Sequence, residues 1–394
     1  MPRILGVIAE YNPFHTGHAY QLQRAREICQ ADYVVVAMST CFTQRGEAAI
    51  LPPAVRAGMA LHDGADAVFA LPAVWAVRDA EHFALGGAAI LDGLGCDAIS
   101  FGTEHTDLAL LHAAAGLLEG EDTRLKAALT PRIASGMPYP AALCAAAEEL
   151  IPGCGAILSD PNSTLAVCYL RALLRLGSSM EVVPVQRRSS YHATALGEAL
   201  PSATALRGAI LRGDWARVRP AMPGQAFRLL REASADGQLH RPDSLDTALL
   251  YRLRTMSPDD YAALPDLSEG IEHRLQAATQ TARTREELLQ TAKTRRYPYA
   301  RLSRLAAHAL LGFTGSMLAS QDKPPVAWLL GFRSDAAPLL QHLTAVSRLP
   351  ILSRSADHDR SAPWFAAEQR AQDIWSLGAG LPTGLALSQR MTIV

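Results

Sequence analysis

The sequence predicts an α/β fold, in which a doubly wound parallel sheet is followed by a mainly helical region. Three observations support this prediction. Short apolar runs alternate with helical stretches over the first half of the chain, polar residues gather directly after the apolar runs, and the strand pattern stops near residue 207. Such alternation is typical of a parallel sheet covered by helices, whose ligands bind at the carboxyl ends of the strands.

Five apolar runs are the predicted strands of this sheet. They cover residues 4–11, 32–39, 67–72, 98–104 and 180–187. Helical patterns fill the intervals, and the predicted helices lie at 20–30, 53–64 and 81–95, with a longer helical insertion before the fifth strand. Because each strand is followed by a helix, neighbouring strands are expected to be parallel.

Residues after the fifth strand have a different pattern. Helical stretches run from residue 206 to about residue 313, short strands are expected at 324–332 and 347–354, and a last helix is expected at 362–380. We therefore expect a domain over residues 1–205 that binds nucleotide and a mainly helical domain over residues 206–394.

Composition and charge narrow the class of protein. The 394 residues suffice for two or three domains. No apolar run reaches the ~18 residues that span a bilayer, and the start lacks the layout of a signal peptide, so a cytoplasmic protein is expected. The net charge of −1 excludes a globally basic nucleic-acid binder but not a local basic patch. The six cysteines show no zinc-binding spacing, so neither a disulfide framework nor a structural metal is expected.

The segment between the first strand and the first helix carries the motif H-x-G-H. His15 and His18 lie where the loop becomes a helix, and free backbone N–H groups at a helix start favour an anion. Gly17 lets a ligand approach the backbone, and the two imidazoles can donate hydrogen bonds to phosphoryl oxygens. We interpret the segment as a nucleotide phosphate site in preference to a capping loop with two incidental histidines.

A second motif lies at the junction of the two predicted domains. Ser202, Thr204 and Arg207 form S-x-T-x-x-R at the start of a predicted helix. Alone, this pattern is more typical of a helix cap with a surface arginine. Beside H-x-G-H it predicts two hydroxyls and a guanidinium on one phosphate group. The pair of motifs resembles the nucleotidyltransferase superfamily, in which both motifs hold ATP.

Seven separated blocks of the sequence resemble a single family. The blocks are GVIAEYNPFHTGHAYQL, MSTCFTQRGEAAI, FGTE, SDPNSTLAVCYL, SYH, SATALR and RRYPYARLSR. Their order is that of the bacterial tRNA(Met) cytidine acetate ligase family, and they span residues 1 to about 310. The resemblance implies an enzyme that uses ATP to activate acetate as acetyl-adenylate and releases diphosphate. It then acetylates the 4-amino group of the wobble cytidine of elongator tRNA(Met), giving N4-acetylcytidine and AMP.

The resemblance also implies which residues form the ATP site. His15, His18 and Arg207 would be the catalytic residues. The remaining contacts with ATP fall in one continuous run and at six further positions. They are Val7, Ile8, Ala9, Glu10, Tyr11, Asn12, Pro13, Phe14, Thr16, Gly17, Ala19 and Tyr20, with Gly102, Asn162, Arg187, Arg188, Ser202 and Thr204. The spacing leaves open which of the two adjacent arginines faces ATP, and Asn162 alone could equally be a helix N-cap.

The acyl side of the reaction is expected at the block Ser39–Glu47. Gln44, Arg45 and Glu47 are the candidates that organise an acetate pocket, with a surface ion pair as the alternative reading of the charged residues. Thr40 replaces a glycine of the family pattern and Ala48 replaces a proline. If the loop needed a positive φ at position 40, the backbone must be arranged differently here.

A basic and aromatic cluster is the predicted contact with tRNA. Its residues are Lys293, Arg295, Arg296, Tyr297, Arg301 and Arg304, with Tyr299 among them. This composition suits phosphate contacts and stacking on an unpaired base, although a solvated helix face would look similar. Six arginines between residues 207 and 231 could extend the patch.

The chemistry expected of the site is mainly positioning and charge neutralisation, with Mg²⁺ as the accompanying ion. Glu47 and Glu104 are candidates for the group that takes the proton of the cytidine amine. Two alternatives stay open: a small-molecule adenylyltransferase, and a noncatalytic tRNA-binding protein on the same fold. No protein partner and no membrane association are expected.

Overall fold

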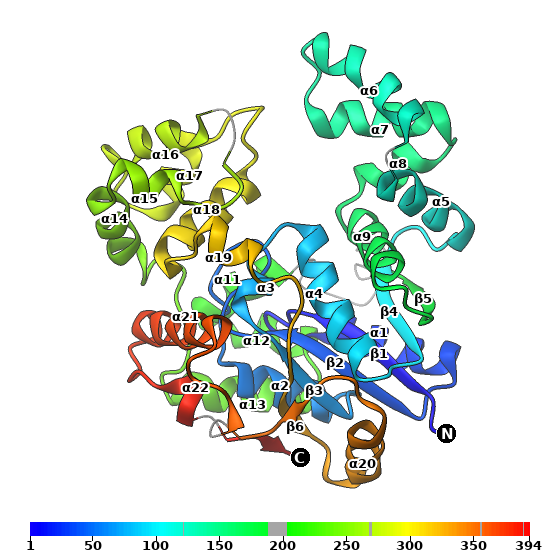
Figure 1. Cartoon of the computed structure of the whole chain (residues 1–394). Helices are drawn as coiled ribbons and strands as arrows, with labels where there is room; N and C mark the ends of the chain where they lie inside the picture. The colour runs from blue at the N-terminus through cyan, green and yellow to red at the C-terminus, as the bar shows by residue number, and fades with distance from the viewer. Residues whose placement is uncertain (121, 188–202, 268–269, 355–356, 389) are drawn as a thin grey trace.

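The computed structural model describes residues 1–120, 122–187, 203–267, 270–354, 357–388 and 390–394. Within these residues, eight strands form a single sheet in the order β5-β4-β1-β2-β3-β6-β7, with β8 paired to β6 (Figure 1). The strands are β1 (Ile4–Ala9), β2 (Tyr33–Ser39), β3 (Ala67–Leu71), β4 (Ala98–Thr103), β5 (Glu181–Gln186), β6 (Ala327–Phe332), β7 (Ile351–Leu352) and β8 (Thr392–Ile393). All five strands expected in the first half are confirmed.

The strands β5, β4, β1, β2 and β3 are parallel, and β1 lies at their centre. Gly6 of β1 faces Val35 on one side and Ile99 on the other. The chain runs outward from β1 to β2 and β3, then returns to β4 on the opposite side of β1. This reversal of strand order is where open α/β sheets bind their ligands, so the loop after β1 occupies the favoured position.

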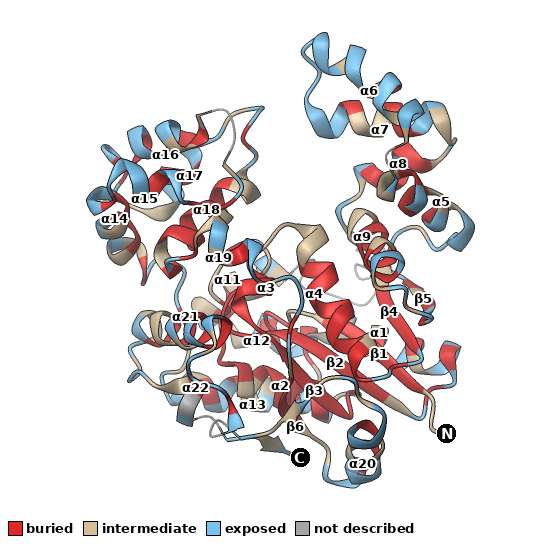
Figure 2. Cartoon of the chain, viewed as in Figure 1, coloured by how far each residue is buried: buried red, intermediate tan, exposed pale blue. Residues whose placement is uncertain are grey.

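Helices on both faces bury the sheet, as the red ribbons of Figure 2 show. The helices of the first half are α1 (Thr16–Cys29), α2 (Pro53–His62), α3 (Ala73–Ala76) and α4 (Ala80–Gly93). Helix α4 packs closely on β1 at Gly87, where an added Cβ would lie only 2.7 Å from the side chain of Ile8. Burial on both faces explains why these strands read as continuous apolar runs.

Two helical groups lie on the same side of the sheet in Figure 1. The first, the insertion between β4 and β5, comprises α5 (Leu108–Glu119), α6 (Thr123–Ala134), α7 (Tyr139–Leu150), α8 (Cys154–Ser159) and α9 (Pro161–Leu176). The second comprises α14 (Asp246–Thr255), α15 (Pro258–Ala262), α16 (Ile271–Thr279), α17 (Arg285–Ala292) and α18 (Tyr299–Leu311), and has an apolar core of its own. We call this second group the helical lobe.

The other helices of the second half lie outside the lobe. They are α11 (Ala203–Leu211), α12 (Trp215–Val218), η2 (Arg219–Ala221), α13 (Gly224–Ala235), α19 (Gly315–Ala319), η3 (Ser334–Ala336), α20 (Ala337–Val346), α21 (Pro363–Ala379) and α22 (Leu385–Ser388). The short strands and the last helix expected near the end of the chain are confirmed as β6, β7 and α21.

The second half of the chain contributes to the sheet as well as to the lobe. Strand β6 pairs antiparallel with β3, and β7 and β8 pair with β6. The expected boundary at residue 205 therefore does not separate a sheet from a helical domain, because residues 327–394 rejoin the α/β body. Strand β3 is apolar throughout, and β6 covers the edge that it would otherwise expose. No helix in the described ranges is long and apolar enough to cross a membrane.

Candidate active site

The H-x-G-H motif forms the first turn of α1. His15 is the N-cap, and its Nδ1 accepts a hydrogen bond from the Gly17 backbone N–H at 3.1 Å. His18 Nδ1 accepts one from the His15 backbone N–H at 3.3 Å, and the two rings stack with centroids 3.7 Å apart. Because each Nδ1 acts as an acceptor, each neutral ring carries its proton on Nε2.

Both imidazoles are held uncharged by their surroundings. Burial, followed by the nearby Arg187 guanidinium, lowers the pKa of His15 to about 4. Burial, His15 and Arg187 lower the pKa of His18 well below its ordinary value. The motif therefore offers two neutral Nε2–H donors near one cation, an arrangement suited to an anionic ligand on which charge develops.

The turn between β1 and α1 is fixed from several directions. Tyr11 has φ 45°, and its ring packs against Phe14 and His18 at centroid distances of 4.8 and 4.9 Å. Asn12 Oδ1 accepts a hydrogen bond from the Ile50 backbone N–H at 2.8 Å. A non-glycine residue in the left-handed region persists only where packing of this kind holds it.

The structure brings the second motif to the first. Arg207 Nη1 donates to the Asn12 carbonyl at 3.0 Å, and Nη2 lies 3.2 Å from Thr204 Oγ1 and 3.3 Å from Glu47 Oε2. Three segments far apart in the sequence therefore meet at one guanidinium. Ser202 and Arg188 lie outside the described residues, and so do the residues of the SYH block.

The carboxyl ends of β4 and β5 supply the other side of the site. Arg187 packs over Gly102, where a Cβ would lie 3.4 Å from the arginine side chain. Its Nε lies 3.2 Å from Glu104 Oε1, which also accepts from Asn162 Nδ2 at 2.9 Å. The alternative reading of Asn162 as a helix N-cap is wrong, because Asp160 caps α9 by accepting from the Asn162 and Ser163 backbone N–H groups.

Residues 43–47 form a turn that contacts both the β1 loop and the helical lobe; we call it the QRGE turn. The Gln44 backbone N–H donates to Glu10 Oε1 at 2.6 Å, and Glu47 reaches Arg207. On the other side, the Ser303 hydroxyl donates to the Arg45 carbonyl, and Arg285 Nη2 donates to the Gly46 carbonyl at 3.2 Å. The QRGE turn thus joins the loop after β1 to the helical lobe.

Thr40 and Ala48 are the two departures from the family pattern, and the backbone at Thr40 does not adopt a positive φ. The non-glycine residues with positive φ in the described ranges are Tyr11, Gln30 and Asp266, so Thr40 is not among them. Its hydroxyl lies beside the buried Glu368 carboxyl of α21 and offsets part of the rise that burial causes in the pKa of Glu368. Ala48 pairs with Phe42 in an isolated β-bridge that closes the QRGE turn.

The predicted RNA cluster divides into outward and inward residues. Lys293, Arg295 and Arg296 are exposed in the segment before α18. Tyr297, with 7% of its surface exposed, belongs to the apolar core of the lobe, which leaves little of its ring for a base to stack on. Arg301 donates to the Asp266 carbonyl, and the partly buried Arg304 guanidinium faces Asp79 and Asp266.

The second set of arginines is also engaged locally. Arg217 pairs with Asp214 at 3.6 Å and Arg228 with Glu232 at 3.9 Å. Arg231 stacks over the Trp215 ring at 4.4 Å, which leaves its other face toward solvent. These contacts restrict the side chains but leave their charge at the surface.

Sequence reasoning missed two residues that shape the site. The fully buried Arg56 donates to the Leu51 carbonyl at 3.1 Å and to the Glu10 carbonyl at 2.5 Å, and Arg285 holds the QRGE turn. An arginine within the otherwise apolar helix 53–62 was a readable signal, because a buried guanidinium needs acceptors. Arg285 carried no comparable signal.

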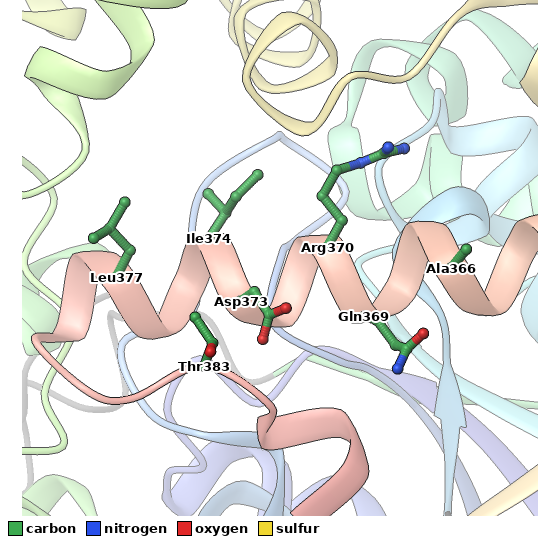
Figure 3. Close-up of a pocket in the computed structure, with 7 residues that line it drawn as sticks. All are labelled: Ala366, Gln369, Arg370, Asp373, Ile374, Leu377 and Thr383. Carbon is green, nitrogen blue, oxygen red and sulfur yellow. The ribbon is translucent and has the colours of Figure 1, made fainter. Parts of the chain in front are cut away.

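A separate hollow of about 500 Å³ lies on α21 rather than at the H-x-G-H loop (Figure 3). Arg370 and Ile374 point from the helix toward the lobe in this view, and Arg370 Nη2 lies 3.5 Å from the Gly312 carbonyl. None of the residues expected to hold ATP lines it.

The parallel sheet, the loop at its switch point and the neutral histidine pair at a helix start define a nucleotidyltransferase. Consistent with this class, a family model described as HIGH Nucleotidyl Transferase matches residues 2–384.

Within that class, this chain belongs to the tRNA(Met) cytidine acetate ligase family. It is 34% identical over 393 residues to the tRNA(Met) cytidine acetate ligase of Syntrophomonas wolfei, with 95% of this chain and 94% of the relative covered. It is 33% identical over 399 residues to the ligase of Bacillus licheniformis, with 98% and 95% covered.

Solved structures of a similar protein agree with the fold. Thermotoga maritima TmcAL bound with alpha-thio ATP matches with a TM-score of 0.91 and 26% identity, covering 99% of each chain. The apo form of that protein matches with a TM-score of 0.92.

Proposed function

We propose that this chain is an ATP-dependent tRNA(Met) cytidine acetate ligase. The observation that carries the proposal is the meeting of three segments at Arg207, which joins the loop after β1, the S-x-T-x-x-R helix and the QRGE turn. The names of its relatives support the same reaction, and the ATP analogue bound to the Thermotoga protein supports the nucleotide. As a bacterial-type tRNA-modifying enzyme, it would act in the cytoplasm.

In the first step an acetate oxygen attacks the α-phosphorus of ATP, and diphosphate leaves. His15 and His18 would donate Nε2–H hydrogen bonds to phosphoryl oxygens, and Arg187 and Arg207 would neutralise the growing negative charge. Neutral donors suit this role, because they stabilise charge without moving a proton. Val7 to Tyr20, Gly102 and Asn162 would line the nucleotide.

Magnesium would enter with the triphosphate. The described residues contain no group of three or more His, Cys, Asp or Glu side chains that could hold a metal ion.

In the second step the wobble cytidine of elongator tRNA(Met) would approach from the helical lobe. The exposed residues Lys293, Arg295 and Arg296 would contact phosphates, while Gln44, Arg45 and Glu47 would organise the acyl side. Because the lobe contacts the QRGE turn through Ser303 and Arg285, RNA held there would lie next to the acyl-adenylate.

The test is formation of AMP and acetylcytidine by the purified chain with ATP, magnesium, labelled acetate and unmodified elongator tRNA(Met). Acetyl transfer that requires all four supports the ligase. Diphosphate release with a different nucleotide acceptor would support the small-molecule adenylyltransferase. tRNA binding without ATP turnover would support the noncatalytic alternative.

A further inference from the structure

The proposed second step lacks an assigned proton acceptor. When the cytidine 4-amino nitrogen attacks the acyl carbon, a C–N bond forms, the C–O bond to AMP breaks, and one N–H proton must leave the nitrogen. The identity of that acceptor rests on the proposed function. Three glutamates lie in the described segments that follow β1, β2 and β4: Glu10, Glu47 and Glu104.

Two of these carboxylates are engaged by arginines. Glu104 lies 3.2 Å from Arg187 Nε and accepts from Asn162, and it follows β4 on the side away from the QRGE turn. Glu47 Oε2 lies 3.3 Å from Arg207 Nη2. Glu47 would have to give up its contact with Arg207 before it could accept a proton from a substrate. Burial raises the pKa of Glu104, but Arg187 and Asn162 both hold its carboxylate.

Glu10 differs from both. Its Oε1 accepts from the Gln44 backbone N–H at 2.6 Å, and within the described residues its carboxylate forms no ion pair. The Arg56 guanidinium binds the Glu10 backbone carbonyl instead of the carboxylate. Glu10 as a whole residue is partly exposed.

The position of Glu10 also favours it. It precedes Asn12, which Arg207 contacts, and it touches the QRGE turn, which Ser303 and Arg285 fasten to the helical lobe. Glu10 therefore joins the loop expected to hold the acyl-adenylate to the turn that contacts the lobe expected to deliver the RNA.

We propose that Glu10 is the base that accepts the proton of the cytidine 4-amino group during acetyl transfer. The carboxylate becomes a carboxylic acid in that step and returns its proton to water before the next turnover.

The charges around Glu10 are consistent with this role. Burial raises the pKa of Glu10 and the neighbouring Glu47 carboxylate raises it further, whereas the Gln44 N–H, Arg45 and Arg56 oppose the rise. The Tyr169 hydroxyl of α9 also interacts with the Glu10 carboxylate, and burial is the main cause that raises the pKa of Tyr169. A base with a raised pKa is a more effective proton acceptor near neutral pH.

The test compares Glu10→Gln with the wild type in two assays. Acetate-dependent ATP–diphosphate exchange reports adenylate formation, and single-turnover acetylation of tRNA reports both steps. Gln preserves the acceptor for the Gln44 N–H. We expect acetylation to fall by about 10²–10⁴-fold and at least tenfold further than exchange, with loss of the acidic limb of the acetylation pH profile.

Glu47→Gln tests the electrostatic coupling to Glu10 and is not a control for basal activity, because Glu47 is itself proposed to organise the acyl side. Removing its charge should lower the pKa of Glu10, so the acidic limb moves to lower pH but persists. The assignment is overturned if Glu10→Gln lowers exchange and acetylation by the same factor, or if its acidic limb is unchanged. A wild-type chain that forms adenylate but never acetylates tRNA would overturn the proposed function itself.

Discussion

At the scale of single residues, the histidine pair shows how a helix cap can set chemistry. Each Nδ1 is occupied by a backbone N–H of the first turn, so local folding decides which ring nitrogen carries the proton. Burial and Arg187 then keep both rings neutral. The proposed phosphate site would therefore be assembled before a ligand binds, which reduces reorganisation during reaction.

Replacing His18 by Ala should slow adenylate formation by about 10²–10³-fold, the usual effect of removing one preorganised donor. The measurement is kcat for acetate-dependent ATP–diphosphate exchange. His62→Ala, a change in the last turn of α2, is the control and should retain the rate within a factor of about two. A normal rate for His18→Ala would contradict the donor role.

The lowered pKa values also predict a dependence of stability on pH. Between about pH 6.5 and pH 4 the unfolded histidines bind protons that the folded rings do not, so the free energy of unfolding should fall as pH falls through this window. His15→Asn keeps a capping oxygen and should show a shallower fall. Denaturant unfolding at several pH values measures both slopes; identical slopes would exclude the contribution of His15.

At the scale of elements, the QRGE turn is the link between the sheet and the helical lobe. Gly46 has φ 73°, and a Cβ there would lie 2.8 Å from the Ser303 carbonyl and 3.0 Å from Arg304 Cα. The turn can therefore approach α18 only with glycine at this position. The contact between Gly46 and α18 therefore also positions Arg45 and Glu47.

Gly46→Ala should destabilise the protein by about 2–4 kcal/mol, since a left-handed alanine costs about 1–2 kcal/mol and the clash adds to it. Gly136→Ala is the matched control, because Gly136 has φ 86° and a Cβ added there would meet nothing within 4 Å. It should show the backbone cost alone and retain acetylation. If the two variants lost the same free energy of unfolding, the added Cβ at position 46 would be accommodated by a shift of α18 that has no energetic cost.

At the scale of the whole molecule, the C-terminal helix supports the site at the N-terminal end of the chain. Trp375 Nε1 donates to the Ala49 carbonyl at 2.6 Å, and the His240 backbone N–H donates to the Ile50 carbonyl at 3.0 Å. The same segment holds Asn12 through the Ile50 N–H. The turn after β1 therefore depends on residues more than 200 positions away.

Trp375→Phe should lose about 1–3 kcal/mol of stability, because the buried Ala49 carbonyl loses its partner. It should also raise KM for ATP more than it lowers kcat, since the loosened segment carries Asn12. Trp364→Phe, at a buried tryptophan of the same helix whose Nε1 makes no hydrogen bond in the described ranges, is the control. An unchanged KM for ATP in Trp375→Phe would show that α21 does not support the proposed ATP site.

The parallel sheet, the strand–loop–helix around His15 and His18, and the family can be predicted from the sequence, because they depend on short-range periodicity and on contiguous motifs. Three features follow from long-range packing and could not be predicted: Arg207 contacts Asn12 and Glu47, Tyr297 is a core residue, and β6 pairs with β3 in the sheet. Burial in the folded chain also lowers the pKa of both histidines and raises the pKa of Glu10. The physical reason is that burial and long-range hydrogen bonds depend on which segments pack together, and periodicity within one segment carries no information about its partners.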